Sequence, residues 1–158
     1  MTSYLLTLKL IHVLGATVLF GTGLGIAFFM WMAHRTRDAA VIAHTASVVV
    51  VADTVFTATA VIVQPISGAF LAHAIGYSLW EPWIVVSLAL YGLVGACWLP
   101  VVWIQAKLRD LAREAARNGA PLPIRYHQLF RVWFVLGWPA FIGVIAIFVL
   151  MIVKPALW

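Results

Sequence analysis

Four long apolar stretches separated by short polar segments define the pattern of hydrophobic and polar positions along this chain. No Asp, Glu, Lys or Arg interrupts residues 10–34, 54–80, 82–106 or 132–153. A helix needs about 20 apolar residues to cross the roughly 30 Å hydrocarbon layer of a bilayer, because it rises about 1.5 Å per residue. Each stretch is long enough, so the pattern predicts an all-α membrane protein built as a four-transmembrane-helix bundle.

We expect one transmembrane domain over residues 1–158. Its helices are expected at about residues 4–32, 44–75, 83–105 and 127–153, with the third continuing into the cytoplasm as a basic extension to residue 117. Asn118 and Gly119 should end that extension, because such residues favour helix termination. The first apolar run is far longer than the core of a cleaved signal peptide, so we interpret it as a retained helix.

The composition excludes a water-soluble globule. Hydrophobic residues make up 65% of the 158 residues and charged residues only 9%, and the mean hydropathy is +1.05. A soluble domain carries about 25% charged residues, most of them at its surface. The single cysteine, Cys97, cannot form an intrachain disulfide. The chain has no motif typical of a hydrolytic zinc site, a phosphate-binding loop or a catalytic triad.

The positive charges predict how the helices are oriented. The formal net charge is +5, and most basic residues lie between the first and second or the third and fourth helices: Arg35, Arg37, Lys107, Arg109, Arg113, Arg117, Arg125 and Arg131. By the positive-inside rule, both connections are cytoplasmic and both termini are outside. Topology and attraction to anionic lipid account for the basic excess, so we expect no binding to nucleic acid. His34 and His127 lie beside these arginines, and we expect both to be solvated.

His12 is the first ionisable residue at membrane depth. The helical rise puts it about 12 Å inside the outer edge of the first helix, and Lys9 is one turn above it on nearly the same face. Ionisable groups at such depth tend to face the protein interior or a wet cavity. The imidazole is a candidate axial haem ligand, proton carrier or hydrogen-bonded core histidine, and the sequence leaves these alternatives open.

Asp53 is the second such residue, and it begins a polar stripe on the second helix. Thr57, Ala60, Gln64 and Ser67 follow at steps of three and four residues, which places all of them on one helix face. We expect this face to point inward. Asp53 is a candidate for relaying protons, binding a cation, holding the polar edge of a ligand or hydrogen-bonding a neighbouring helix.

A b-type haem usually takes two axial ligands from facing helices. His73 is the candidate partner of His12, because both lie toward the outer side. Nine residues separate His73 from Gln64, so it lies on the opposite face from the polar stripe unless Pro65 reorients the upper half of the helix. Met151, near the outer end of the fourth helix, is a weaker candidate. The second ligand therefore stays open.

Other features predict contacts between helices. Ser87, Tyr91 and Trp98 share one face of the third helix, which suits either a flat aromatic ligand or helix packing. Gly21 and Gly25 form a GxxxG pair, typical of close packing within one bundle or at a homodimer interface. Prolines lie within three spans, at Pro65, Pro100 and Pro139. Because each removes a helical hydrogen bond, the carbonyls that they free need other partners.

Several blocks of the sequence carry a family resemblance. They are residues 8–14, 52–57, 64–68, 97–105 and 129–134, together with 137–141. Through these blocks nearly the whole chain resembles a bacterial family of predicted integral membrane proteins of unknown function. The resemblance implies a multi-pass protein of the bacterial inner membrane.

A more distant resemblance rests on Lys9 and His12 in the first helix, His34 near its end, Ser67-Gly68, and the terminal Lys154-Pro155. These positions are similar to HemJ-type protoporphyrinogen oxidases, which are small four-helix membrane proteins that bind haem b. The resemblance implies that His12 is one axial ligand of the haem iron. The other ligand in those proteins is a Lys at the outer start of the third helix, and residues 83–87 contain none.

We therefore hypothesise that the protein binds haem b and acts in one-electron redox chemistry or porphyrin handling, which would make it a haem-dependent membrane oxidoreductase. The residues expected at the cofactor are His12, His73, Lys9 and Tyr91, with Asp53 and Gln64 as supporting polar groups. Two alternatives are a small proton-coupled transporter or channel built around Asp53 and Gln64, and a non-catalytic partner subunit or homodimer in the lipid bilayer. The sequence identifies no catalytic residue, substrate or redox partner.

Overall fold

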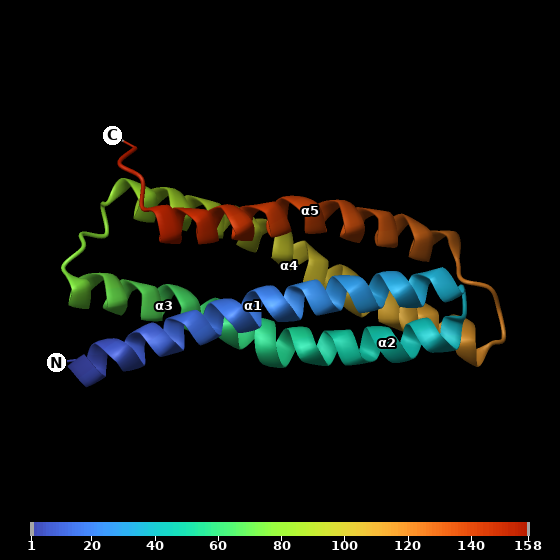
Figure 1. Ribbon diagram of the computed structural model, residues 1–158. Helices are drawn as coiled ribbons and strands as arrows, with labels where there is room; N and C mark the ends of the chain where they lie inside the picture. The colour runs from blue at the N-terminus through green and yellow to red at the C-terminus, as the bar shows by residue number, and fades with distance from the viewer. Residues whose placement is uncertain (1, 158) are drawn as a thin grey trace.

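The computed structural model describes residues 2–157, and these residues form long helices without strands (Figure 1). The elements are α1 (Thr2–Thr36), α2 (Ala39–Ala52), the π-helical turn η1 (Asp53–Thr57), α3 (Ala58–Ile75), α4 (Pro82–Arg117) and α5 (Ile124–Val153). Because α2, η1 and α3 follow one another without a break, they make a single crossing. The described residues thus form four helices long and apolar enough to span a membrane. This confirms the predicted all-α bundle of four transmembrane helices.

The connection between α1 and α2 is much shorter than expected. Only Arg37 and Asp38 lie between the two helices, and Arg37 adopts a left-handed conformation with φ of 58°. The Asp38 carboxylate caps α2 by accepting the backbone N–H groups of Ala40 at 2.8 Å and Val41 at 3.2 Å. Asp is a preferred residue at this position. The start predicted near His44 was wrong, because the Asp38 cap lets α2 begin at Ala39, directly after the two-residue connection.

At the end that carries the basic connections, the four spans pack around one core. The element α2 contacts both α1 and α4 there, while α5 lies along α4. The buried side chains of this core are Ile26, Met30, Ala33, Ile42, Ala43, Ala46, Val49, Ile104, Leu108, Ala112, Tyr126, Phe130 and Trp133. This end holds the bundle together.

Toward the other end the bundle consists of two helix pairs, joined by a small buried cluster of Ala72, Trp83 and Ile84. There α1 packs along α3 and α4 packs along α5, whereas α1 and α5 share few contacts (Figure 1). Both termini lie at this end, as an even number of crossings requires. Large apolar side chains such as Leu10, Leu99, Val135 and Ile152 point outward, where they meet lipid in a bilayer. The placement of both termini outside the cell stays a prediction.

Close approach of helices depends on glycines other than the GxxxG pair. A Cβ atom added to Gly143 would lie 2.7 Å from Val94 Cγ2, and one added to Gly68 would lie 2.9 Å from His12 Cε1. At Gly21, in contrast, an added Cβ would meet no described atom within 4 Å. Gly143 therefore permits the contact of α5 with α4, and Gly68 permits that of α3 with α1.

Pro65 lies inside α3, and the structure shows where its freed carbonyl finds a partner. Proline has no N–H group to donate to the carbonyl four residues earlier, which belongs to Val61. The hydroxyl of Tyr91, on α4, donates to this oxygen at 2.7 Å. The expected need for an outside donor is confirmed at this proline, and the resulting hydrogen bond joins the two helix pairs.

We predict that Tyr91→Phe destabilises the protein by about 1 kcal/mol, because the Val61 carbonyl is left without a donor. In a Pro65→Ala background the same substitution should cost much less, since the new N–H group at position 65 reaches that carbonyl. Unfolding by SDS titration from a mild detergent measures both losses. Equal losses in the two backgrounds would contradict this account of the hydrogen bond.

Candidate functional site

The π-helical turn η1 determines which way the polar stripe of the second crossing faces. The N–H of Ala58 bonds to the carbonyl of Asp53, five residues earlier. Compared with an α-helical turn, the extra residue rotates the remainder of the crossing by about 100°. Asp53 and Thr57 accordingly line a space facing α4, while Gln64 and Ser67 contact α1. The stripe is largely buried, as predicted, but it forms two separate polar clusters instead of one.

The first cluster surrounds the Asp53 carboxylate, which is 3% exposed. Oδ1 accepts a hydrogen bond from the indole N–H of Trp98, on α4, at 3.2 Å. With its amide nitrogen toward Asp53, Gln105 donates to Oδ2 at 3.0 Å, and its oxygen accepts from the indole N–H of Trp133 at 3.2 Å. In the opposite orientation the Gln105 oxygen would face the Asp53 carboxylate, and its amide nitrogen would face the N–H of Trp133. These four side chains join η1, α4 and α5 through buried hydrogen bonds.

Thr57 lies beside this cluster with unused hydrogen-bonding capacity. The residue is 5% exposed, and its hydroxyl lies beside the Asp53 carboxylate but has no partner at hydrogen-bond distance and angle among the described residues. Buried polar groups in proteins are nearly always paired, so an unpaired one needs an explanation. The hydroxyl lines a cavity, which gives it access to a partner that is not part of the chain.

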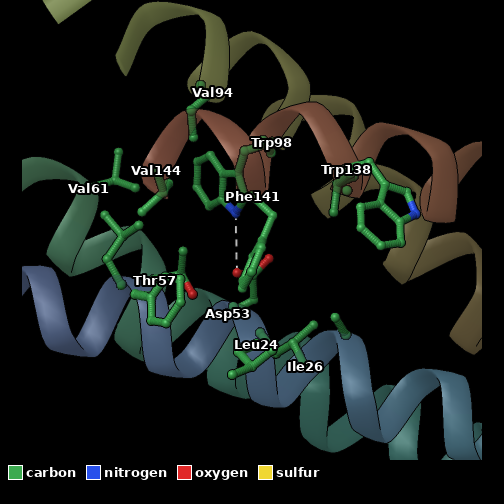
Figure 2. Close-up of a pocket in the computed structure, with 18 of the residues that line it drawn as sticks. Leu24, Ile26, Asp53, Thr57, Val61, Val94, Trp98, Trp138, Phe141 and Val144 are labelled. Atoms are coloured by element: carbon green, nitrogen blue, oxygen red, sulfur yellow. Dashed lines mark hydrogen bonds between the residues drawn. The ribbon is translucent and has the colours of Figure 1, made fainter. Parts of the chain in front are cut away.

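An apolar cavity of about 330 Å³ lies between α1 on one side and α4 and α5 on the other. In Figure 2 the indole of Trp98 points across it toward Asp53, with Phe141 and Val144 of α5 along the wall. Leu24 and Trp138 also line the cavity, and both are exposed at the surface of the bundle. The cavity therefore opens to the lipid phase between α1 and α5 at Leu24 and Trp138, beside the stack of Phe20 on Phe141 that joins these two helices.

The predicted aromatic face of α4 contributes to this cavity only in part. Tyr91 and Trp98 both line it, each with its polar atom bonded to the second crossing. Ser87 does not line it; its hydroxyl donates to the carbonyl of Trp83 in its own helix at 2.6 Å. Two cavity residues, Gln105 and Trp133, were missed as site candidates. Gln105 follows Trp98 by seven residues, or two helical turns, and this spacing is the signal that places it on the same face.

The second polar cluster holds His12 between α1 and α3. Its Nδ1 lies 3.0 Å from the hydroxyl of Ser67, and its Nε2 lies 3.4 Å from the amide nitrogen of Gln64. The Ser67 hydroxyl donates to the backbone carbonyl of Gln64 at 3.1 Å. With the Gln64 amide nitrogen toward the ring, Nε2 accepts and Nδ1 carries the proton that it donates to Ser67. The Gln64 Oε1 atom is then buried without a partner among the described residues. The ring packs against Gly68.

This arrangement does not fit an axial haem ligand as it stands. Both ring nitrogens of His12 are engaged, and His12 is not among the residues that line the cavity. Lys9 and His73 are exposed, and Met151 packs against the cluster formed by Trp83 and Ile84. Among the described residues, no three His, Cys, Asp or Glu side chains gather as a metal site. Haem binding through His12 stays a prediction, and it requires that Gln64 first leave Nε2.

We predict that Gly68→Ala destabilises the protein by about 1–3 kcal/mol, because the added methyl group would overpack the His12 ring. His12→Ala should cost stability by itself, yet it should remove most of the effect of Gly68→Ala when the two are combined. Thermal unfolding in detergent of the wild type, both single variants and the double variant measures this coupling. Strictly additive losses would show that His12 does not press on Gly68.

At the opposite end of α1, the expectation that both interfacial histidines are solvated holds only in part, because His34 is half-buried. His34 was expected to be solvated, but its ring stacks on Phe130 with 3.7 Å between centroids, and its Nδ1 lies 3.3 Å from the hydroxyl of Tyr126. The reason is that α1 continues to Thr36, which keeps His34 within the helix and turned toward α5. His127 is exposed, as expected.

The fold and its internal polar clusters define a multi-pass integral membrane protein. Residues 6–155 match the family model described as predicted integral membrane protein, DUF2269, so the chain belongs to this family. The match confirms the expected family of membrane proteins, whereas the likeness to HemJ-type oxidases and the bacterial inner membrane stay predictions. No curated protein and no solved structure matches the chain.

Proposed function

We propose that the protein binds a lipophilic molecule carrying one hydrogen-bonding group, which it takes up from the lipid phase into the cavity beside Asp53. The single observation that carries this proposal is an apolar cavity of about 330 Å³ whose wall presents an unpaired, buried hydroxyl at Thr57. Binding sites for small molecules are concave, mostly apolar and furnished with a few polar groups, at volumes of about 300–1,000 Å³.

The path into the cavity supports a ligand that comes from the membrane. The lining residues Leu24, Phe134 and Trp138 are exposed on the side between α1 and α5. A lipophilic molecule already dissolved in the bilayer can enter there without crossing water. The cavity lies within the spans, so entry from water would require a polar route through the core of the bundle.

The polar cluster supports a ligand with a hydroxyl or similar group. The Asp53 oxygens are held by Trp98 and Gln105, so the carboxylate is fixed in position before a ligand arrives. The Thr57 hydroxyl can both donate and accept. A ligand hydroxyl that reaches Thr57 can form a hydrogen bond with its side-chain oxygen. Among the described residues, this is the buried cavity-lining side-chain oxygen without a partner. Binding in this way costs little rearrangement, because the surrounding hydrogen bonds are already made.

A titration with ω-bromoundecanol tests the proposal. Its bromine quenches tryptophan fluorescence, and Trp98, Trp133 and Trp138 line the cavity. We expect partial, saturable quenching of the detergent-solubilised protein, and weaker binding of bromoundecane by about threefold to tenfold, because the alkane cannot bond to Thr57. Thr57→Val should bring the two affinities together. Quenching that never saturates would mean mere partition into detergent, and would overturn the proposal.

The haem hypothesis is a separate proposal that the same preparation tests. That hypothesis requires a Soret band in an absorption spectrum of the wild type recorded after haem supplementation, oxidised and then reduced, and loss of the band in His12→Ala. If no band appears in the wild type, haem binding is refuted and the lipophilic-ligand proposal is unaffected, because His12 does not line the cavity.

A further inference from the structure

We propose that the protein has a second site, at the end that carries the basic connections, that binds a phosphate-bearing anion. The site is a hollow of about 710 Å³ lined by His34, Arg35, Arg37, Leu122 and His127. It lies between the α1–α2 connection and the start of α5, and it shares no lining residue with the apolar cavity. A lipid headgroup and a free phosphate compound both offer the oxygen atoms that such a set of donors recognises.

Two of the donors of the hollow, Arg35 and His34, are held by neighbouring aromatic residues. The Arg35 guanidinium lies 5.0 Å from the ring centre of Trp31, so the arginine stem is anchored along α1. His34 is fixed by its stack on Phe130 and by its contact with the Tyr126 hydroxyl, and its other nitrogen, Nε2, makes no hydrogen bond to a described residue. Held groups lose less conformational freedom on binding than free ones.

The hollow holds positive charge without a matching carboxylate. Among the described residues, the one ion pair joins Arg109 to Asp110 on α4, and neither residue lines the hollow. Asp38 is the nearest acidic residue in sequence, and its Oδ1 is committed to the cap of α2. The positive-inside rule explains why arginines gather at this end. It does not explain why Arg35 and Arg37 converge with two histidines on one hollow.

Two backbone features point the same way. Arg37, which lines the hollow, adopts a left-handed conformation with φ of 58°, which glycine adopts far more readily. The hollow also lies beside the start of α5, whose first turn has neither a capping side chain nor an acidic residue. Free N–H groups at a helix start favour a bound anion. Both features add to what the side chains provide.

Native mass spectrometry of the protein in mild detergent, with dioleoylphosphatidic acid and dioleoylphosphatidylcholine as competing probes, tests the site. We expect retention of phosphatidic acid over phosphatidylcholine. Arg37→Gly should lower the bound phosphatidic acid by about tenfold, as expected for loss of a charge-assisted contact. This variant relieves the left-handed backbone, so a loss of binding does not reflect a loss of folding. The combined Arg35→Gln and Arg37→Gln variant should lose still more.

Arg117→Gln is the matched control, because it removes a positive charge from the same membrane side but outside the hollow. It should bind phosphatidic acid like the wild type. Inorganic phosphate identifies the source: displacement of the lipid assigns the site to the phosphate group itself, and retention assigns it to the lipid headgroup with its chains. Equal losses in Arg117→Gln and Arg37→Gly, or equal retention of the two lipids, would overturn the proposal.

Discussion

Replacing Gly95 with Leu should lower the affinity for ω-bromoundecanol by about tenfold or more, because the new side chain occupies space that the ligand needs. Gly95 lines the cavity on α4, and a Cβ added there meets no described atom within 4 Å. We therefore expect the isobutyl group to extend into the cavity that Gly95 lines. Leucine is also the better helix former by roughly 0.5–1 kcal/mol, so the variant should be at least as stable as the wild type.

Gly92→Leu is the control for this experiment. Gly92 lies on the same helix, also has no described atom within 4 Å of an added Cβ, and does not line the cavity. It makes the same chemical change on a face that is exposed to lipid. We expect wild-type quenching by ω-bromoundecanol in this variant. If both leucine variants bind like the wild type, the probe occupies some other part of the protein.

Asp53→Leu should destabilise the protein by about 2–4 kcal/mol, the second large effect that we expect. The substitution removes the acceptor of two buried donors, Trp98 Nε1 and Gln105 Nε2, and each donor left unpaired costs about 1–3 kcal/mol. The leucine side chain has a similar size, so loss of hydrogen bonds and not loss of packing dominates. SDS titration of the detergent-solubilised protein measures the change in the free energy of unfolding.

A second substitution separates these hydrogen bonds from other effects at Asp53. In Asp53→Leu combined with Trp98→Phe, one orphaned donor is removed together with its acceptor, and replacing both partners of a hydrogen bond costs far less than removing one. The double variant should therefore recover part of the stability lost in Asp53→Leu. A further loss of stability in the double variant would mean that the Trp98 indole contributes mainly through packing.

The four spans could be predicted because the thickness of the bilayer sets the length of a transmembrane helix, and apolar runs of that length are visible in the sequence. The end of α4 was also predictable, since Asn118 and Gly119 follow its last helical residue, Arg117. The beginning of α2 was not, because an apolar pattern gives no boundary where the chain turns within two residues. The Asp38 cap carried that information, and it is a local hydrogen-bonding signal rather than a hydrophobic one.

The site was predictable residue by residue but not as an arrangement. Asp53, Tyr91 and His12 stood out because polar groups are rare within apolar spans, and the structure gives each of them polar partners. The π-helical turn rotates α3 relative to α2, and this rotation decides which helix each polar residue faces. The regular spacing of the polar residues gave no sign of that turn. An undistorted helix would have directed Asp53 and Gln64 to one side and favoured a single shared site.

The contact of Trp133 with Gln105 could not be predicted from the sequence. Its indole completes the polar cluster by donating to Gln105, but it does so across the contact between α4 and α5. Helical spacing relates residues within one helix and says nothing about which residue of the next helix they meet. The pairing of helices in space therefore had to come from the structure, as did the cavity that lies between them.

The most direct test is to locate the bromine atom of ω-bromoundecanol in crystals of the protein by anomalous diffraction. We predict one ordered bromine between α1 and α5, near the opening lined by Leu24 and Trp138, with the hydroxyl end of the chain at Thr57. The signal should be absent from crystals of Gly95→Leu. Bromine found only on the outer, lipid-facing surfaces of the helices, with the space beside Asp53 free of probe, would contradict the proposed function.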